Sequence, residues 1–338
     1  MKKILVTGGL GYIGSHTVVE LQQMGFQVVI IDNLSNAELS VLERIEKITG
    51  DRPAFYQIDL REKQSVSNFF ETHQLDGIIH FAASKAVGES VENPLLYYEN
   101  NVHSLVYLLQ QCQKHNVQNF IFSSSCTVYG EPDYLPITEE APVKAAISPY
   151  GNTKQISEEI LKDTCKVSQL QAISLRYFNP IGAHESGEIG ELPMGTPQNL
   201  VPFITQTAAG IRKELRVYGN DYPTPDGSCI RDYIHVVDVA KAHVVALRRL
   251  LDHKNSSNME IFNLGTGKGS SVLEVIHTFE KVSGTKLPYT IVDRRTGDVV
   301  AVYADTTKAN EVLGWKTEKT MEEALSSAWE WERNIRSL

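Results

Sequence analysis

The segment that ends at Asp32 constrains the fold more than any other part of the chain. The apolar run KILVT at residues 3–7 precedes TGGLGYIGSH, whose glycines at 8, 9, 11 and 14 lead into a predicted helix. The spacing satisfies both G-x-G-x-x-G and G-x-x-G-x-x-G, which bring backbone amides at a helix N-terminus close to a pyrophosphate. A second apolar run, QVVII, ends at Asp32, whose carboxylate can bind an adenosine ribose and repel a 2′-phosphate. This unit predicts an NAD site rather than an NADP site.

The alternation of apolar runs continues beyond Asp32. AFYQI, GIIHF, NFIFSS and AISLRYF are separated by polar or helix-like stretches, which predicts an α/β fold with a doubly wound parallel sheet. From about residue 180 the chain becomes rich in Gly, Pro and Asn. We therefore predict a Rossmann domain over residues 1–180 and a smaller α/β substrate domain over 181–338. Later segments, about 231–265, are expected to cross back to the first domain.

Composition excludes several classes of protein. The 338 residues carry a formal net charge of −9 without a basic cluster, which argues against a nucleic-acid partner. No apolar run approaches the roughly 20 residues of a membrane span, and MKK is followed by too short an apolar run for a signal peptide. The four cysteines, at 112, 126, 165 and 229, form no C-x-x-C pair, and the histidines show no H-x-x-x-H spacing. We expect a cytoplasmic protein without a metal site.

Tyr150 and Lys154, in the run SPYGNTK, are the candidate catalytic pair. On a helix an i,i+4 pair shares one face, so a phenol and an ammonium group can act at one point. Lowering the pKa of a tyrosine from about 10 to about 7 takes roughly 4 kcal/mol, which a close lysine and one more positive group could supply. The phenolate would be a general base for an alcohol proton. Taken alone, the same spacing also arises by chance in many proteins.

Small and polar residues follow the predicted strands. Ala82, Ala83, Ser84 and Lys85 follow one strand, Ser123 to Ser125 end the next, and Asn179 follows a third. Ligands of parallel sheets bind beyond the carboxyl ends of the strands, where small residues admit a flat nicotinamide. A serine beside Tyr150 could help to pass a proton. The alternative is that the serines only end a strand.

Longer motifs resemble the extended short-chain dehydrogenase/reductases, and within that family the sugar-nucleotide 4-epimerases. The resemblance covers nearly the whole chain and is carried by TGGLGYIGSH, IDNLSN, HFAASKAVGES, NPLLYYENNV, SSSCTVYG, SPYGNTK, LRYFNPIGAH, GNDYPTPDGSCIRDYIHV and RRTGD. Three positions depart from it, and one is Ser84, which stands where a bulkier residue is common. Asn152 stands where Lys or Arg is common, and Cys126 stands where Ala or Ser is common. Cys126 has two interpretations. It is either a reactive thiol, which would make the activity sensitive to thiol reagents, or a buried and inert cysteine.

The resemblance implies a role for individual residues. Tyr150 resembles the base, Lys154 the residue that holds the nicotinamide ribose, and Ser125 a hydroxyl shared with the sugar. The positions that match cofactor contacts are Gly8, Gly11, Tyr12, Ile13, Gly14, Asp32, Asn33, Asn36, Asp59, Leu60, Phe81, Ala82, Lys85, Asn100 and Phe178. Those that match contacts to the nucleotide sugar are Asn179, Asn199, Leu200, Tyr218, Arg231, Arg295, Asp298 and Val302.

The implied reaction interconverts UDP-glucose and UDP-galactose through a 4-ketose, with tightly bound NAD, rotation of the ketose and return of the hydride. The C4 proton cannot go to a base, because no adjacent carbonyl stabilises a carbanion. Arg231 and Arg295 suit a diphosphate, although either could be a surface cation. Two alternatives are weighed. A 4,6-dehydratase needs an acid pair after Thr127, where Val128 and Tyr129 stand. A non-enzymatic NAD-binding regulator would be expected to lack Tyr150 and Lys154.

Two finer expectations concern specificity and assembly. Val302 matches a gate position at which a Tyr restricts the family's pocket to glucose and galactose, so the resemblance implies activity on UDP-GlcNAc and UDP-GalNAc as well. The alternative is that Val302 only packs. The stretch 94–115 has apolar residues at helical spacing and could pair with the Tyr150 helix of a second copy. A homodimer is therefore expected, although the spacing also fits a core helix.

Overall fold

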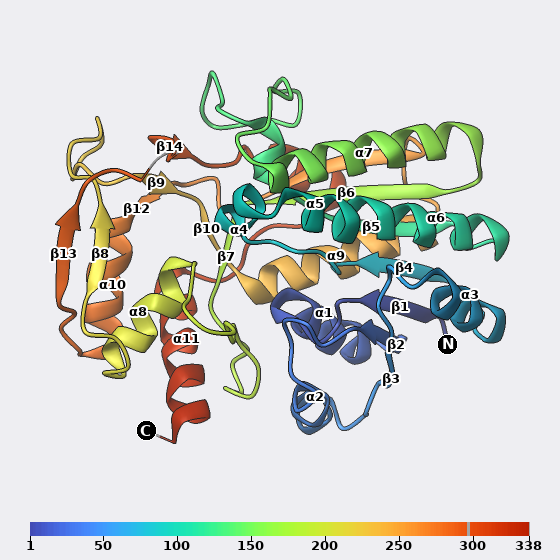
Figure 1. Cartoon of the computed structure of the whole chain (residues 1–338), viewed down its shortest axis with the longest axis horizontal. Coiled ribbons are helices and arrows are strands. Elements are labelled where there is room, and N and C mark those ends of the chain that lie inside the picture. Colours follow the sequence, from blue (N-terminus) through green and yellow to red (C-terminus); the bar gives the residue numbers. More distant parts are fainter. Residues whose placement is uncertain (296–297, 338) are drawn as a thin grey trace.

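The computed structural model describes residues 1–295 and 298–337, and Figure 1 shows a larger α/β part beside a smaller one. The strands and helices of the first half are β1 (Lys3–Thr7), α1 (Tyr12–Gln23), β2 (Gln27–Asp32), α2 (Val41–Thr49), β3 (Ala54–Gln57), α3 (Lys63–Thr72), β4 (Gly77–His80), α4 (Val87–Glu92), α5 (Pro94–Tyr97), the π-helical turn η1 (Tyr98–His103), α6 (Ser104–Lys114), β5 (Asn119–Ser125), the 3₁₀ turn η2 (Cys126–Tyr129) and α7 (Pro149–Val167).

The second half holds shorter strands between its helices. They are β6 (Gln171–Tyr177), β7 (Asn179–Ile181), α8 (Leu200–Ala208), β8 (Leu215–Tyr218), β9 (Ile230–Arg231), β10 (Tyr233–His235), α9 (Val236–Leu251), β11 (Met259–Leu264), β12 (Ser270–Ser271), α10 (Val272–Ser283), β13 (Tyr289–Val292), β14 (Ala301–Val302), η3 (Ala309–Leu313) and α11 (Met321–Arg336).

The larger part is built on a seven-stranded sheet with the order β11-β6-β5-β4-β1-β2-β3, all of whose pairs are parallel. The strand order reverses between β1 and β4, where dinucleotides bind in doubly wound folds. Every apolar run that the sequence singled out from residue 3 to residue 177 forms a strand of this sheet. The predicted doubly wound fold is confirmed.

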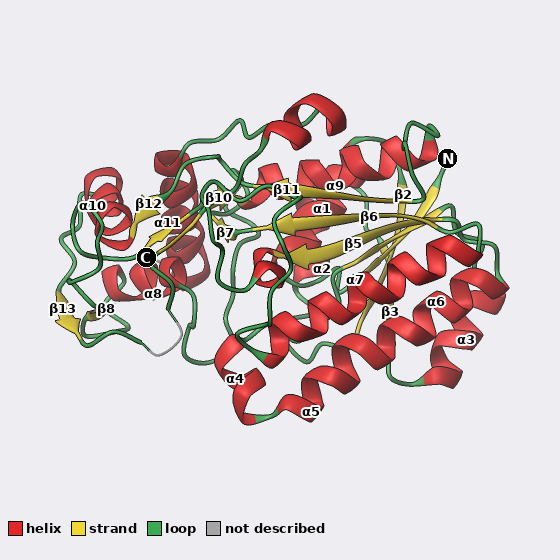
Figure 2. Cartoon of the chain, turned by 90° about the horizontal axis from the view of Figure 1, so that it is seen from above, coloured by secondary structure: helices red, strands yellow, loops and turns green. Residues whose placement is uncertain are grey.

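Helices cover both faces of this sheet, as Figure 2 shows. One apolar core joins the strands to α1, α2 and α9, and includes Val18, Leu42 and Val239. The core on the opposite face joins them to α3, α6 and α7, and includes Phe70, Leu108 and Leu161. Strands buried on both faces read as continuous apolar runs, which is why they were visible in the sequence.

The smaller part contains β8, β13, α8, α10 and α11, which lie on the left of Figure 1. Its core includes Val217, Phe279 and Leu325. Helix α10 begins with a capping box, in which the Ser271 hydroxyl accepts the Glu274 N–H and the Glu274 carboxylate accepts the Ser271 N–H. The run GTGKGSS at residues 265–271 resembles a phosphate loop, but it leads into this helix and its last serine is the helix cap. The chain returns to the main sheet only with α9 and β11, since β9 and β10 pair in small sheets.

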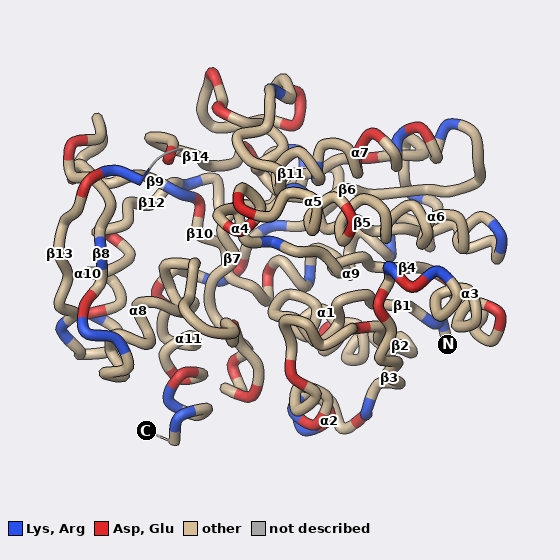
Figure 3. Tube along the Cα trace, in the orientation of Figure 1, with Lys and Arg blue, Asp and Glu red and all other residues tan. Residues whose placement is uncertain are grey.

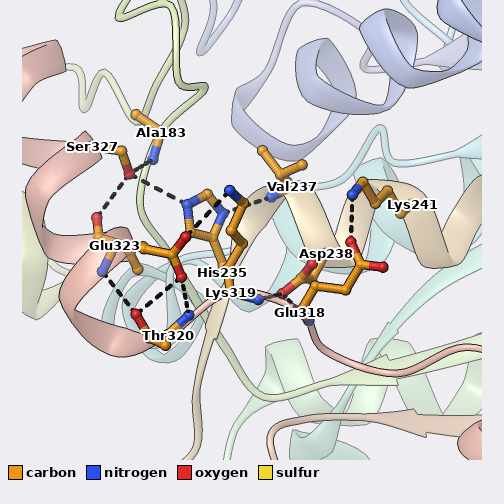
Figure 4. Close-up of polar contacts among 11 residues, drawn as sticks. Ala183, His235, Val237, Asp238, Lys241, Glu318, Lys319, Thr320, Glu323 and Ser327 are labelled. Carbon is orange, nitrogen blue, oxygen red and sulfur yellow. Dashed lines mark hydrogen bonds and ion pairs between the residues drawn. The ribbon is translucent and has the colours of Figure 1, made fainter.

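Figure 4 shows the joint between these two parts around His235 and Ser327. The His235 Nδ1 atom accepts the Val237 N–H (3.1 Å) and thereby caps α9, while its Nε2 atom lies 3.4 Å from the Ser327 hydroxyl. Ser327 in turn accepts the Ala183 N–H (3.1 Å). Asp238 Oδ2 accepts the backbone N–H groups of Glu318 and Lys319 (3.1 and 3.0 Å). The joint therefore holds α11 against the segment that follows Asn179.

Buried histidines should make the fold sensitive to mild acid. Burial lowers the pKa of His16 and His80 to about 3, and that of His235 and His243 to about 4. Between pH 6.5 and 5 these rings are neutral in the folded chain but take up protons on unfolding. The full contribution of these histidines to the free energy of unfolding is therefore present above pH 6.5. It falls as the pH drops, by up to about 1.4 kcal/mol per pH unit for each histidine. Denaturant midpoints measured from pH 7.5 to 5 check this.

A matched pair of substitutions isolates one histidine. His235→Asn keeps a capping oxygen for Val237 and removes one titrating ring, so its midpoint should fall less between pH 6.5 and 5 than that of the wild type. His253→Asn makes the same chemical change at an exposed residue with a left-handed backbone (φ 54°), which Asn tolerates. Equal pH slopes for His235→Asn and the unmodified protein would refute this explanation.

Charged residues of both signs are interspersed along the chain trace in Figure 3. The net charge of −9 is thus not concentrated in one segment of the described chain. Within residues 1–295 and 298–337, no helix is both long enough and apolar enough to span a bilayer.

Candidate functional site

The turn from β1 to α1 leaves no room for side chains at two of its glycines. A Cβ on Gly8, whose φ is +68°, would lie 2.8 Å from the Ala82 nitrogen. A Cβ on Gly14 would lie 2.2 Å from the Gly8 carbonyl oxygen. Gly11 is the N-cap of α1, and no side chain caps its amides. The turn is thus a bare backbone cradle at a helix N-terminus, next to the reversal of strand order, and it fits a dinucleotide pyrophosphate.

Asp32 lies at the carboxyl end of β2, beside this cradle. Its Oδ2 atom accepts the Leu10 N–H (3.2 Å), and its Oδ1 atom accepts the Leu34 N–H (2.9 Å). These bonds fix the carboxylate against the glycine turn. Burial nevertheless raises the pKa of Asp32 above its ordinary value, because the charged form loses water. An acidic group in this place favours a ribose diol over a 2′-phosphate.

Other predicted cofactor residues meet in pairs around the same edge of the sheet. The Asn33 amide donates to Asp59 (3.1 Å), and the Arg61 guanidinium beside Asp59 lowers the pKa of that carboxyl to about 2. The Asn100 amide donates to the Ser84 hydroxyl (2.9 Å). Phe81 and Ala82 follow β4, and the Ala82 N–H donates to the Thr7 carbonyl (3.1 Å). Asn36 is exposed.

Ser125, Tyr150 and Lys154 come from two adjacent elements, β5 and α7. The Tyr150 and Lys154 side chains are buried, and the Lys154 ammonium lies 5.9 Å from the centroid of the Tyr150 ring. Lys154 donates a hydrogen bond to the Ser123 carbonyl (2.8 Å). The Ser125 hydroxyl accepts the Thr127 N–H (3.2 Å), which turns the chain into η2. Helix α7 starts at Pro149 with Ser148 as its cap, so Tyr150 lies in its first turn.

The Tyr150 phenol departs from the expectation of a lowered pKa. Burial raises the pKa of Tyr150 above its ordinary value, and the nearby Tyr177 adds to this, while contact with the Ser125 hydroxyl acts in the opposite direction. Burial is the main cause, and the Lys154 ammonium, which donates its hydrogen bond to the Ser123 carbonyl, does not offset it. In the chain by itself, Tyr150 is a neutral phenol, and ionising it requires further positive charge in the site.

Cys126, next to Ser125, is not a reactive thiol by its electrostatics. Burial raises the pKa of Cys126 to about 12, despite the favourable charge of Arg231. A thiol with such a pKa carries almost no thiolate near neutral pH. The structure therefore favours the inert alternative for this cysteine.

The predicted diphosphate residues converge around Asp298. Arg231 donates to the Val299 carbonyl (2.9 Å) and lies 3.4 Å from Asp298. Arg295 approaches the same carboxylate (3.1 Å), and its guanidinium lies 5.4 Å from the centroid of the Tyr218 ring. Arg231, Arg295, Asp298 and Tyr218 thus form one cluster, although three different segments supply them.

The other predicted substrate residues lie on β7, at the start of α8 and on β14. Asn179 starts β7 and pairs with Tyr233 of β10. Asn199 precedes α8, and Leu200 is the first residue of that helix. Val302 pairs with Arg231 between β14 and β9 and packs in a small apolar cluster with Tyr129 and Phe178. Val302 thus lies beside both the arginine cluster and the segment that leads to Asn179.

The sequence reading missed Glu191, which the structure places between predicted cofactor and substrate residues. Its Oε1 atom accepts hydrogen bonds from the Lys85 ammonium (3.2 Å) and the Asn199 side-chain amide (2.6 Å). Its backbone carbonyl accepts the indole N–H of Trp331 (3.0 Å). Glu191 lies in a Gly- and Pro-rich stretch without periodicity. Its one signal in the sequence was its position between two motifs, NPIGAH and the run that contains Asn199.

Known proteins resemble this chain over nearly its whole length. The family model described as GDP-mannose 4,6 dehydratase matches residues 5–328. A UDP-glucose 4-epimerase from Drosophila melanogaster is 51% identical over 97% of this chain and 96% of that protein. The crystal structure of a UDP-glucose 4-epimerase from Stenotrophomonas maltophila, with bound NAD and formylated UDP-arabinopyranose, superposes with a TM-score of 0.96 at 47% identity, covering 100% of this chain and 99% of the other.

A third relative bears on specificity. The UDP-Glc/GlcNAc 4-epimerase of Campylobacter jejuni has a TM-score of 0.85 at 38% identity, covering 99% of this chain and 100% of its own.

The fold and the site together define an extended short-chain dehydrogenase/reductase of the kind that modifies nucleotide sugars. Within that class, the chain belongs to the UDP-glucose 4-epimerase family.

Proposed function

We propose that the chain interconverts UDP-glucose and UDP-galactose by oxidation and re-reduction at C4 of the hexose. The observation that carries this proposal is the placement of Ser125, Tyr150 and Lys154 at the edge of the sheet that also carries the glycine turn and Asp32. Epimerases with the same fold and about half of the same residues support it. The dehydratase alternative lacks its acid pair, since buried Val128 and Tyr129 follow Thr127.

The residues of the chain divide the chemical work between them. When bound, NAD supplies the hydride acceptor and donor and, in its oxidised form, a further positive charge. Tyr150 takes the proton of the C4 hydroxyl and later returns it, and the Ser125 hydroxyl lies beside it to share that proton. Lys154 provides fixed positive charge that favours the phenolate. The closed redox cycle requires that the cofactor stays bound, for which the glycine cradle and Asp32 provide the contacts.

Inversion at C4 requires that the nucleotide is held firmly and the hexose loosely. The cluster of Arg231, Arg295 and Asp298 provides the firm end, because a guanidinium binds phosphate oxygens with paired hydrogen bonds. Tyr218 offers an aromatic face beside Arg295. With the diphosphate held by these groups, the 4-ketose can turn and present its opposite face before the hydride returns.

The proposal is tested by incubating the purified protein, without added NAD, with UDP-galactose. The predicted outcome is UDP-glucose with no net NADH absorbance. A 4-keto-6-deoxy product would instead identify a dehydratase. An unchanged substrate, with NAD bound at full occupancy, would indicate the non-enzymatic regulator and refute the proposal.

We further propose that N-acetylated UDP-hexoses are substrates, because Val302 occupies the gate position without the reach of a phenol. The existence of a UDP-Glc/GlcNAc 4-epimerase of the same fold supports this. Val302→Tyr should lower turnover of UDP-GlcNAc at least about tenfold, the equivalent of 1.4 kcal/mol, while turnover of UDP-galactose changes little. Val302→Ile serves as an apolar control. Undetectable UDP-GlcNAc turnover by the unmodified protein at saturating substrate would end the proposal.

Assembly, location and domain division follow as proposals of the same kind. Val91 and Leu95, on α4 and α5, are apolar and strongly exposed (62% and 80%), which supports a homodimer formed with the neighbouring α6 and α7. Light scattering would measure its mass.

All four cysteines are free, which suits a reducing cytoplasm. We assign residues 1–180, with α9 and β11, to the NAD domain and most of 181–338 to the UDP-sugar domain.

A further inference from the structure

A buried carboxylate without an assigned role lies one helical turn beyond Lys154. Glu158, on α7, accepts four hydrogen bonds. The Ser124 and Ser174 hydroxyls donate to its Oε1 atom (2.7 Å each), as does the Arg176 Nε atom (3.0 Å). The second Arg176 nitrogen donates to Oε2 (2.5 Å). All four side chains are buried, so this is a buried ion pair whose carboxylate accepts hydrogen bonds at both oxygens.

Glu158 and its partners belong to the three segments that carry the proposed reaction. Ser124 immediately precedes Ser125 at the end of β5, and Arg176 precedes Tyr177, Phe178 and Asn179 at the end of β6. Glu158 itself shares a helix with Tyr150 and Lys154. The Arg176 guanidinium also lies over the Tyr129 ring (4.7 Å). The ion pair therefore fixes the position of α7 relative to both strands.

Lys154 needs a counter charge more than a surface lysine does. It is 4% exposed, and the Phe122 ring lies 4.9 Å from its ammonium group. Burial lowers the pKa of Lys154 to about 8, and the charge of Glu158 acts in the opposite direction. Further titratable groups on α7 are Tyr150, Glu159, Lys162, Asp163, Cys165 and Lys166, and those on the described elements packed against it include His80, Tyr97, Cys126, Arg176 and Tyr177. The His80 ring, whose pKa is lowered to about 3, is neutral and offers Lys154 no compensating charge.

We propose that Glu158, held by Arg176, Ser124 and Ser174, is a positioning residue that keeps Lys154 charged and aligned with Tyr150. Lys154 and Glu158 form an i,i+4 pair, and the Cβ atoms of such a pair lie about 5–6 Å apart on one helix face. The inference deepens the proposed epimerase function and rests on it. The four hydrogen bonds of Glu158 all go to Arg176, Ser124 and Ser174. Its effect passes through Lys154.

The test is the pH dependence of UDP-galactose epimerisation from pH 6 to 10. Glu158→Gln removes the negative charge and keeps the shape, so the alkaline limb of kcat should move to lower pH by about one unit. Glu158→Gln also leaves Arg176 buried without its partner and could fail to fold. The double variant Glu158→Gln/Arg176→Met removes both charges and should fold, because buried ion pairs tolerate apolar replacement. Its alkaline limb should also move to lower pH, because the carboxylate charge that favours the Lys154 ammonium is gone.

Ser174→Ala is the matched control. It removes one hydrogen bond to the same Oε1 atom without changing charge, so it should leave the alkaline limb in place. Melting temperature and bound NAD are measured for every variant. If the wild type is active and its alkaline limb of kcat superimposes on that of the double variant, the proposal is overturned. A shift in Ser174→Ala as large as that in Glu158→Gln would also overturn it. Absence of epimerisation by the wild type would refute the proposed function instead.

Discussion

Tyr150→Phe is expected to lower kcat for UDP-galactose by about 10²–10⁴-fold, the usual contribution of a positioned general base. The variant loses only the hydroxyl that exchanges a proton with the C4 oxygen. Its ring still packs beside Tyr97, with ring centroids 6.5 Å apart, so the shape of the site is kept. The measurement is the rate of UDP-glucose formation, with bound NAD and UDP affinity determined on the same preparation.

The binding measurements make this result specific. NAD occupancy and UDP affinity should stay close to those of the wild type, because the glycine turn and the Arg231–Asp298 cluster are untouched. A rate within a few-fold of the wild type would mean that another group takes the proton. Loss of NAD together with rate would leave Tyr150 as a structural residue rather than the base.

Gly14→Ala should abolish NAD binding and, with it, more than about 99% of the activity. The added methyl carbon would lie 2.2 Å from the Gly8 carbonyl oxygen and 2.9 Å from the Gly9 Cα atom. Both are backbone atoms of the cradle, so the turn itself must move, at a cost of about 1–3 kcal/mol for overpacking. The displaced amides no longer meet a pyrophosphate. Bound NAD per chain, measured after denaturation, checks this.

Gly88→Ala provides the control for this substitution. Gly88 also lies in a helix, α4, but an added Cβ would meet only the Gln198 side chain at 3.8 Å. This variant should bind NAD normally and be as stable as the wild type or slightly more so. Normal NAD content in Gly14→Ala would contradict the assignment of the β1–α1 turn to the pyrophosphate.

The sequence predicted the fold well because the strands of the main sheet are buried on both faces. Runs such as QVVII and GIIHF are continuous and apolar for that reason, and glycines mark the turn between β1 and α1. The short strands β7, β9, β10, β12 and β14 were not predicted. They contain two or three residues each, and their pairing joins segments far apart in the chain, as between Arg231 and Val302.

The charged residues that position other site residues could not be predicted from the sequence. Glu191 contacts Lys85, which is 106 positions away, and Glu158 contacts Arg176 across a helix and a strand. Neither lies in a spacing with a chemical meaning of its own. The direction of the Tyr150 pKa was also out of reach, because it depends on burial and on the Lys154 hydrogen bond rather than on the i,i+4 spacing.

The closed redox cycle at C4 is tested most directly with UDP-galactose that carries deuterium at C4 of the hexose. The purified protein, with bound NAD and no free cofactor, should give UDP-glucose that keeps the deuterium at C4, because the same hydride leaves and returns. Mass spectrometry and proton NMR of the product measure this. Loss of the deuterium to solvent, or its transfer to another carbon, would contradict the account.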